Sequence, residues 1–384
     1  MNINIINLKV RNLLLCVIFL LSISGCQKAQ ISPEQTSPAV NRAKTSLVLN
    51  NAILEQSNDR DNTIWKIKAD NIVYSEDKQN ATLKTVIGNL LQDGKTILEI
   101  SAKAGEIKDN GNIIFLRDEI IARDTRNGTI VRSNNIEWRP QENVLLISQD
   151  SNDTLNGTHP NLEVTAAAGK YYTDIESLEL EGEVVATTDK PALQLTSDRV
   201  IWSIPQDIIK SKTKLEIVRY QSDKTITDRL VADRAQLNLA ENTAILNNNI
   251  ELISLDPKLQ IATESLTWNY ENRIGNADKP IQIIDRDRQL SITGNQGRID
   301  LQQQVINLED GVQGINQKNL SQLYAHQLMW DITSEELEAT GNVVYEQADP
   351  KINLTGDKAA GTLGDNNIVV TSDGNKQVTS IIDN

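Results

Sequence analysis

Side chains that could perform acid–base, nucleophilic or metal chemistry are scarce in this chain of 384 residues. It contains only two histidines, His159 and His326, and two cysteines. Zinc sites and cysteine–histidine pairs need several such residues grouped together. The sequence therefore predicts no metal, no cofactor and no enzymatic activity. His159 precedes Pro160 in a turn, where we expect a solvated ring, and we expect His326 at an exposed bend.

The formal net charge of −14 argues against nucleic-acid binding. Proteins that bind nucleic acid hold its phosphates with clustered lysines and arginines, whereas here 52 acidic residues outnumber 38 basic ones. Apolar residues make up 39% of the chain, which is enough to build a core. We therefore expect a folded protein that does not bind nucleic acid.

Cys26 is the cysteine with a clear chemical interpretation. The chain starts with a positively charged segment, continues with an apolar run at 13–21, and reaches Ile23-Ser24-Gly25-Cys26. This run is shorter than the ~20 residues that span a bilayer and is typical of a signal peptide. The last four residues resemble a bacterial lipobox, in which Cys26 would be acylated after removal of residues 1–25. The alternative is an ordinary signal or a short anchor with an incidental cysteine.

Residues 27–46 are rich in Gln, Ser, Thr and Ala, contain two prolines, and show no apolar rhythm. Such a composition is typical of a flexible linker. The sequence thus predicts three parts: a signal peptide at 1–25, a lipidated cysteine and flexible tether at 26–54, and a folded body at 55–384.

The body is a tenfold repeat of an eight-residue window. Every window opens with Ile, Val or Leu, has a small residue at its third place, and starts 31 to 35 residues after the previous one. The windows open at Ile67, Ile100, Val131, Val164, Leu195, Leu230, Ile261, Ile292, Leu323 and Leu354. Bulky and small residues alternate at the sixth place, so the true period is about 64 residues in two halves.

The spacing within a window predicts a bent strand. Places one and three share a face of a strand, as do places six and eight, because side chains alternate. The step from place three to place six is odd and would reverse the face of a regular strand. If all four side chains point inward, a bulge or corner must lie at places three to five, where the strand leaves one sheet and joins the facing one.

Short alternating runs between the windows, such as 178–185 and 305–312, predict further strands, and acidic turn residues separate them. No segment of the body has a helical pattern, so we expect an all-β fold. Tryptophans recur at the eighth place, at 138, 202, 268 and 330. They could form a sugar-stacking ladder, but their fixed place in the repeat favours a buried core.

The ten residues that open the windows form an apolar stripe with two possible roles. They could be plain core, or together they could line a groove for lipid. Carrying a lipid through water exposes its tails at ~0.8 kcal/mol per CH₂, or about 10 kcal/mol for a chain of ~14 carbons. A covered groove removes that cost without any reaction chemistry, which favours lipid contact for the stripe as a whole.

The windows, read as I-x-A-x-x-x-x-Y/W followed by L-x-L-x-G-N-V, resemble the OstA-like repeat of the LptC and LptA proteins of lipopolysaccharide transport. The resemblance covers residues 60–380. It implies an elongated, twisted, open β-jellyroll of two antiparallel sheets, with a groove for acyl chains. With its N-terminal membrane attachment, the chain resembles an enlarged, cyanobacterial-type LptC. Family members usually have about five half-repeats, and this chain has ten.

The resemblance implies a periplasmic bridge component, anchored by its lipid most simply to the inner membrane. Its expected partners are lipopolysaccharide, an inner-membrane lipopolysaccharide-export ABC transporter and an LptA-like bridge protein. Strand addition at the two terminal edges would join the partners, which makes Ile64, Ile368 and Val370 edge candidates. One alternative is a structural or adhesive surface lipoprotein. Another is a polysaccharide-cleaving β-helix, but this enzyme would need a cluster of charged residues that interrupts the repeat, and no such cluster is visible in the sequence.

Replacing the lipidated residue, Cys26→Ala, is expected to release the protein from its membrane, because one acylated N-terminus is the only attachment that the sequence predicts. Cell fractionation with mass spectrometry of the N-terminus measures this. A variant that stays membrane-integrated and retains residues 1–25 would contradict the lipobox.

Overall fold

A computed structural model describes residues 47–57, 63–148, 153–363, 367–372 and 378–381. The chain divides into units 1–44 and 45–384, and all described residues lie in the second unit. The signal peptide, Cys26 and most of the expected tether lie outside the described residues. The second unit is all β: its described residues form 28 strands and three short 3-10 turns, with no α-helix among them.

The strands in the first half of the unit are β1 (Val48–Ser57), β2 (Thr63–Tyr74), β3 (Ala81–Gln92), β4 (Lys95–Lys108), β5 (Ile113–Asp124), β6 (Ile130–Arg139), β7 (Val144–Ile147), β8 (Leu155–His159), β9 (Leu162–Ala166), β10 (Ala168–Tyr172), β11 (Ser177–Asp189), β12 (Ala192–Ser203), β13 (Ile208–Ser211) and β14 (Leu215–Tyr220). Those in the second half are β15 (Ile226–Ala232), β16 (Arg234–Asn238), β17 (Thr243–Leu255), β18 (Lys258–Asn269), β19 (Ile274–Ala277), β20 (Ile281–Asp285), β21 (Leu290–Gly294), β22 (Gln296–Asp300), β23 (Val305–Asn316), β24 (Ser321–Asp331), β25 (Glu336–Gln347), β26 (Ile352–Thr362), β27 (Asn367–Thr371) and β28 (Thr379–Ile381). The 3-10 turns are η1 (Asp109–Gly111), η2 (Pro140–Glu142) and η3 (Ile204–Gln206).

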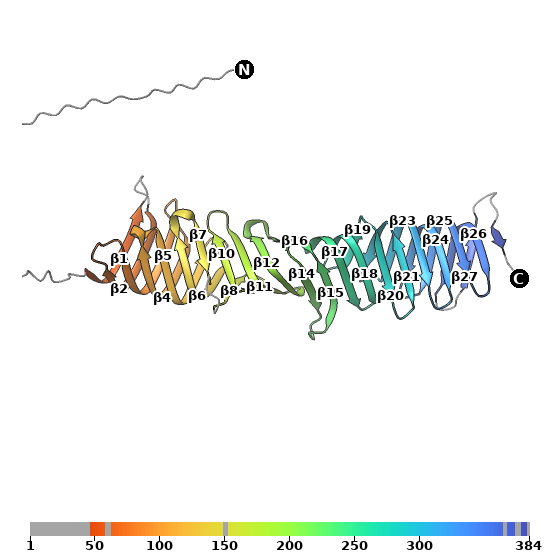
Figure 1. Ribbon diagram of the computed structural model, residues 1–384, viewed down its shortest axis with the longest axis horizontal. Coiled ribbons are helices and arrows are strands. Elements are labelled where there is room, and N and C mark those ends of the chain that lie inside the picture. Colours follow the sequence, from red (N-terminus) through yellow and green to blue (C-terminus); the bar gives the residue numbers. More distant parts are fainter. Residues whose placement is uncertain (1–46, 58–62, 149–152, 364–366, 373–377, 382–384) are drawn as a thin grey trace, which may run out of the picture. The chain divides into compact units, whose positions relative to one another are not determined.

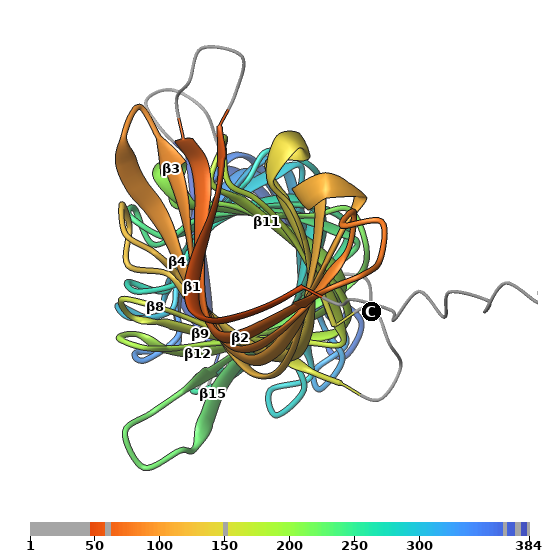
Figure 2. The same cartoon turned by 90° about the vertical axis from the view of Figure 1, so that its left-hand side faces the viewer.

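The strands form two facing walls joined along one side (Figures 1 and 2). We call the wall that contains places one to three of each window the first wall, and the wall that contains places six to eight the second wall. Fourteen long strands, β1–β6, β11, β12, β17, β18 and β23–β26, pass through both walls, and short strands pair between them. The first wall adds β8, β9, β14, β15, β20, β21 and β28, and the second adds β7, β10, β13, β16, β19, β22 and β27.

The predicted all-β, jellyroll-like architecture is confirmed. The two sheets expected from the sequence are the two walls of one continuous antiparallel sheet, because the long strands run from one wall into the other.

The line where the long strands bend, which we call the corner, lies where the window spacing predicts it. Between β11 and β12, Glu181 pairs with Arg199 and Val184 pairs with Ser197, so two residues of β11 oppose one of β12. These two residues of β11, Gly182 and Glu183, have positive φ angles of 76° and 48°. Equivalent pairs with positive φ lie on β5, β17, β23 and β25, at 118–119, 248–249, 310–311 and 341–342. Glycine, asparagine and aspartate dominate these pairs because they adopt this backbone region most readily.

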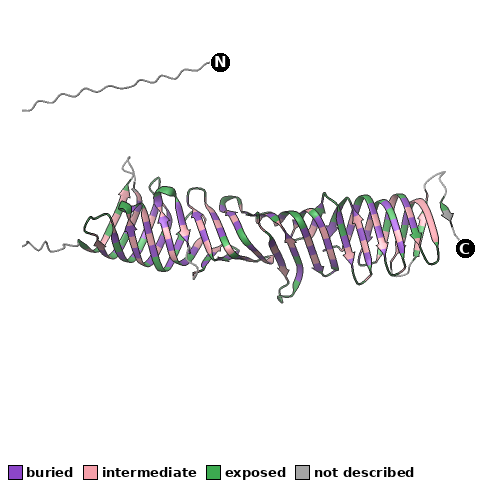
Figure 3. Cartoon of the chain, viewed as in Figure 1, coloured by how far each residue is buried: buried purple, intermediate pink, exposed green. Residues whose placement is uncertain are grey.

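All four predicted places of the windows point inward. The opening residues are buried in nine windows and half-buried at Leu354. The tryptophans at the eighth place are 0 to 3% exposed, which confirms that this series is core. Buried and exposed residues alternate along the strands in both walls (Figure 3).

The small residues at the sixth place leave no empty space between the walls. A Cβ at Gly169 would lie 2.7 Å from Leu155 Cδ2, and one at Gly297 would lie 2.6 Å from Leu308 Cδ2. Leucines thus fill the space above these glycines.

The terminal strands differ from the expectation. β1 starts at Val48, inside the stretch expected to be tether, and pairs along its length with β2. Ile64 therefore lies on β2, which has a neighbour on each side, and the N-terminal edge of the described sheet is β1. At the other end β27 pairs with β26 alone among the described residues, so Ile368 and Val370 do lie on an edge strand.

Candidate functional site: the apolar interior and its seam

The interior between the walls is the candidate site. The ten residues that open the windows lie on every second strand of the first wall, from Ile67 on β2 to Leu354 on β26. At the usual strand spacing, neighbours in this stripe are about 10 Å apart. The structure thus brings the sequence-predicted residues together as one apolar line that faces the second wall. Nine of the ten belong to a single core cluster, and Leu354 packs against that cluster.

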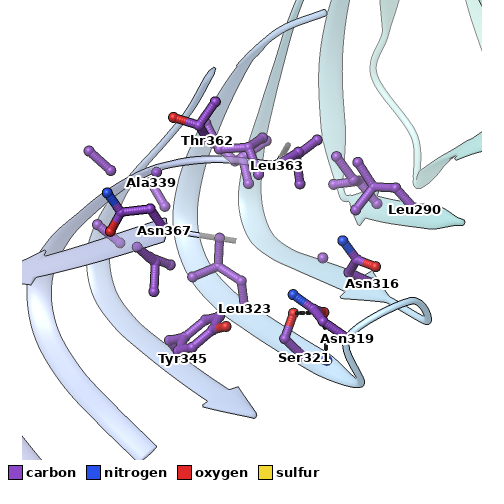
Figure 4. Close-up of a pocket in the computed structure, with 18 residues that line it drawn as sticks. Leu290, Asn316, Asn319, Ser321, Leu323, Ala339, Tyr345, Thr362, Leu363 and Asn367 are labelled. Atoms are coloured by element: carbon purple, nitrogen blue, oxygen red, sulfur yellow. Dashed lines mark hydrogen bonds between the residues drawn. The ribbon is translucent and has the colours of Figure 1, made fainter. Parts of the chain in front are cut away.

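The interior is filled by side chains. A cavity lined mainly by apolar residues lies near the C-terminal end, between Leu290, Leu323 and Tyr345 of the first wall and Ala339, Leu363 and Asn367 of the second (Figure 4). It holds about 70 Å³, little more than the volume of two water molecules. An acyl chain can therefore occupy the interior only if the walls move apart.

The side of the interior opposite the corner is closed by contacts between turns. Here the turns that end the first wall face the turns that end the second wall, and we call this line the seam. Three arginines, each paired with a buried aspartate, make contacts across it. We call these three contacts the latches and name each by its arginine: Arg126, Arg273 and Arg288.

The Arg126 latch joins the β5–β6 turn to the β10–β11 turn. The Arg126 guanidinium donates from Nη2 to the carbonyl oxygen of Thr173 at 2.7 Å, and Nη1 lies 3.5 Å from Glu176 Oε1. The same guanidinium pairs with the carboxylate of Asp124. The Asp124 side chain is 1% exposed and accepts a 2.7 Å hydrogen bond from the Tyr171 hydroxyl. Two turns of opposite walls are thereby held through one buried carboxylate.

The other two latches use different turns for the same purpose. Arg273, in the turn after β18, donates to both carboxylate oxygens of Asp228 on β15, at 2.9 and 2.7 Å, and to the Asp256 carbonyl at 2.6 Å. Arg288, in the β20–β21 turn, pairs with Asp285 at 2.7 Å and reaches Glu335 of the second wall at 2.9 Å. Asp228 and Asp285 are both buried.

The Arg126 latch changes the acid–base behaviour of its members. Burial acts to raise the pKa of Asp124, but hydrogen bonds from Arg126 and Tyr171, together with the Arg126 charge, outweigh it and lower the pKa. Burial and the hydrogen bond to Asp124 raise the pKa of the Tyr171 hydroxyl, which stays protonated as the donor.

The two histidines have different positions relative to the seam. His159 is half-buried, and its ring meets the Trp202 ring of the second wall edge-on, with centroids 5.1 Å apart. Burial lowers its pKa, against the charge of Asp207. The prediction of a solvated His159 was wrong, because the turn folds over the seam. His326 is an exposed bend residue at the corner, as predicted.

The three arginines were not among the residues predicted from the sequence. They lie in turns outside the windows, at positions that do not recur with the repeat. A latch depends on which turn of one wall faces which turn of the other. No spacing within the sequence specifies that pairing.

The comparisons with known proteins agree with this architecture. The family model for lipopolysaccharide-assembly, LptC-related proteins matches residues 13–150 and 212–317. No curated protein sequence matches the chain. The two matched segments cover more than half of the chain, which therefore belongs to the LptC-related family. This is a family of non-enzymatic proteins of the cell envelope with a role in lipopolysaccharide transport, through transporter and bridge partners. Among the described residues, no helix has the length and apolar character needed to cross a membrane.

Neutralising a latch carboxylate, Asp124→Asn, is expected to destabilise the protein by about 2 kcal/mol at pH 7, because charge-assisted hydrogen bonds are lost. The pKa of Asp124 is lowered in the folded state. The ionised Asp124 therefore stabilises the fold above about pH 3.9, the approximate pKa of an aspartate in the unfolded chain. This stabilisation is lost as the pH falls through the lower pKa that Asp124 has in the folded protein.

Urea unfolding at pH 7, 4 and 3 measures this difference. Asp198→Asn, at the exposed corner, is the matched control and should have little effect at any of these values. A destabilisation by Asp124→Asn that is as large at pH 3 as at pH 7 would contradict the electrostatic account.

Proposed function

We propose that this protein is a periplasmic bridge component that carries lipopolysaccharide from an inner-membrane ABC transporter toward the outer membrane. Its apolar interior holds the acyl chains while the sugars stay outside in water. The observation that supports this most directly is the continuous stripe of inward residues from Ile67 to Leu354, which runs beside a seam along the described unit. Family membership supports the lipid class.

The number of strands determines the length of the apolar interior. Each wall contains 21 successive strands, which at ~4.8 Å between neighbours extend for about 95 Å. Over that distance a lipid tail stays out of water, avoiding a cost of about 10 kcal/mol for each chain of ~14 carbons. A single chain with ten half-repeats thus spans this distance. Shorter bridge proteins would have to dock end to end to span it.

We propose that an acylated Cys26 anchors this body to the inner membrane through the linker that precedes β1. In this proposal residues 27–46 are the flexible linker that their composition predicts, and about twenty such residues have a root-mean-square reach of about 25 Å. This is enough to keep the body close to a membrane transporter without fixing its orientation.

The filled interior favours a second candidate, a structural or adhesive β-repeat lipoprotein that carries no lipid. In that case the apolar stripe is plain core, and the small cavity beside Leu323 is a packing defect. The two functions differ in whether lipid ever contacts the inward residues.

Photo-crosslinking distinguishes the two candidates. A photoreactive residue at the inward Leu195 or Ile261 is expected to crosslink lipopolysaccharide in living cells, whereas the outward neighbours Thr196 and Ala262 should give at least about tenfold less, because outward side chains do not reach the interior. Circular dichroism checks the fold of each variant. Equal crosslinking from inward and outward places, or none from either, would contradict lipid carriage.

We also propose that the two terminal edges join the protein to its neighbours by strand addition. At the C-terminal edge β27 is short, its Val369 is exposed, and Ile368 and Val370 pack against the core. At the N-terminal edge β1 exposes Val48 and Ile53. Unpaired edges with apolar side chains are templates for another strand. β27 would accept the next bridge protein, and β1 the transporter.

Deleting residues 363–384, which removes β27 and β28, is expected to abolish capture of a purified LptA-like protein while the upstream repeats stay folded. Ile368→Pro should weaken the same capture, because proline removes a backbone donor and breaks the strand. Ile53→Pro on β1 is the matched control: it should leave this capture intact and weaken binding to the transporter. Unchanged capture after the deletion would refute the C-terminal edge.

A further inference from the structure

The seam is closed unevenly along its length. The Arg126 latch closes it near β5 and β10, and the Arg273 and Arg288 latches close it from β15 onward. Between them lies a gap of about 340 Å³. One side of the gap is formed by His159, Leu162 and Lys190 of the first wall, and the other by Leu239 and Tyr270 of the second wall.

The gap combines a polar rim with an apolar floor. Asn161, Lys190 and Asn242 line the rim, whereas Leu162 and Tyr270 are 5% and 3% exposed and belong to the core cluster. This is the arrangement that an amphiphile requires, with a polar head in water and a tail beside the core. The Arg126 and Arg273 latches hold the walls together on either side of the gap.

The latches are strong enough to hold the seam and can also be released. Each has a planar guanidinium bonded to a buried carboxylate and to a group of the opposite wall, a geometry that is stronger than an exposed ion pair. Unlike the interlocked core, each latch depends on the side chain of one arginine. Opening the seam therefore breaks a few polar contacts at each latch and leaves every strand pairing intact.

We propose that the seam is the side entrance of the interior for acyl chains, and that the Arg126, Arg273 and Arg288 latches keep it shut until a lipid enters at the gap between them. This proposal rests on the proposed function, because it assigns the route that the lipid takes. The ligand class is an amphiphile with one or more long acyl chains and a polar head that stays at the rim.

The test neutralises one latch without leaving a buried charge. The double variant Arg273→Gln/Asp228→Asn keeps two side chains that can hydrogen-bond but removes both charges. The matched control is Arg199→Gln/Glu181→Gln, an ion pair at 3.2 Å on the corner side, whose members are about half exposed. The full chain without residues 1–25 is used, and circular dichroism verifies its fold.

Two measurements are made on each protein. Stopped-flow fluorescence follows the uptake of cis-parinaric acid, a fluorescent fatty acid. Hydrogen–deuterium exchange without lipid follows the turns on either side of the seam. The latch variant is expected to take up the probe about tenfold faster, as a lost charge-assisted contact of ~1.4 kcal/mol would give, and to exchange faster at its seam turns. The control should match the wild type in both.

The two readouts separate the failure of the route from the failure of the function. If the wild type takes up the probe and the latch variant does so no faster, the latches do not control entrance and the proposal is overturned. Faster exchange only at the corner would also overturn it. If no variant takes up lipid, the proposed function fails, and faster exchange at the seam turns then still supports the latches as the closure of the seam.

Discussion

Everything in this structure depends on keeping four side chains of one bent strand pointing inward on both sides of the bend. A regular strand would reverse its face between place three and place six of the window. Two residues with positive φ on the neighbouring strand, such as Gly182 and Glu183 opposite Asp198, absorb the odd step. This bulge turns one pleated sheet into two facing walls with a shared core. Repeated along the chain, it produces a long interior without any helix to cover it.

Bending the sheet leaves the side opposite the corner without a wall. The two walls end there in turns, and the core would face water. The chain closes this side with polar side chains, mainly the three latches, and with His159 against Trp202. The two sides of the interior therefore differ physically. The corner is continuous backbone with fixed strand pairing, while the seam is a set of side-chain contacts that can break singly. A sheet of this architecture has only one side that can open without unfolding.

Three buried indoles give the interior a further constraint. The Nε1 donors of Trp138, Trp202 and Trp330 have no hydrogen-bond partner in the structure, whereas Trp65 donates to Gln56 at 2.6 Å. Tryptophan supplies a large apolar surface to a core with few other aromatic residues, and that burial outweighs an unmade hydrogen bond. The repeated tryptophan therefore has a structural reason to occupy the eighth place.

The sequence by itself determined the elements and their inward faces. Ile, Val or Leu at place one, the small third residue and the odd step to place six are local properties of each strand, and they recur ten times, so the all-β fold, the corner and the buried tryptophans could all be read from spacing. What it could not determine is which turns meet across the interior. The position of Arg273 beside Asp228, 45 residues earlier, follows from the twist and stagger of the walls accumulated over several strands. β1 was missed for a different reason: it starts 19 residues before Ile67, as β3 starts 19 residues before Ile100, but it lies in a stretch whose composition predicts a tether. Strand identity is a matter of local alternation, whereas the seam is set by the sheet as a whole.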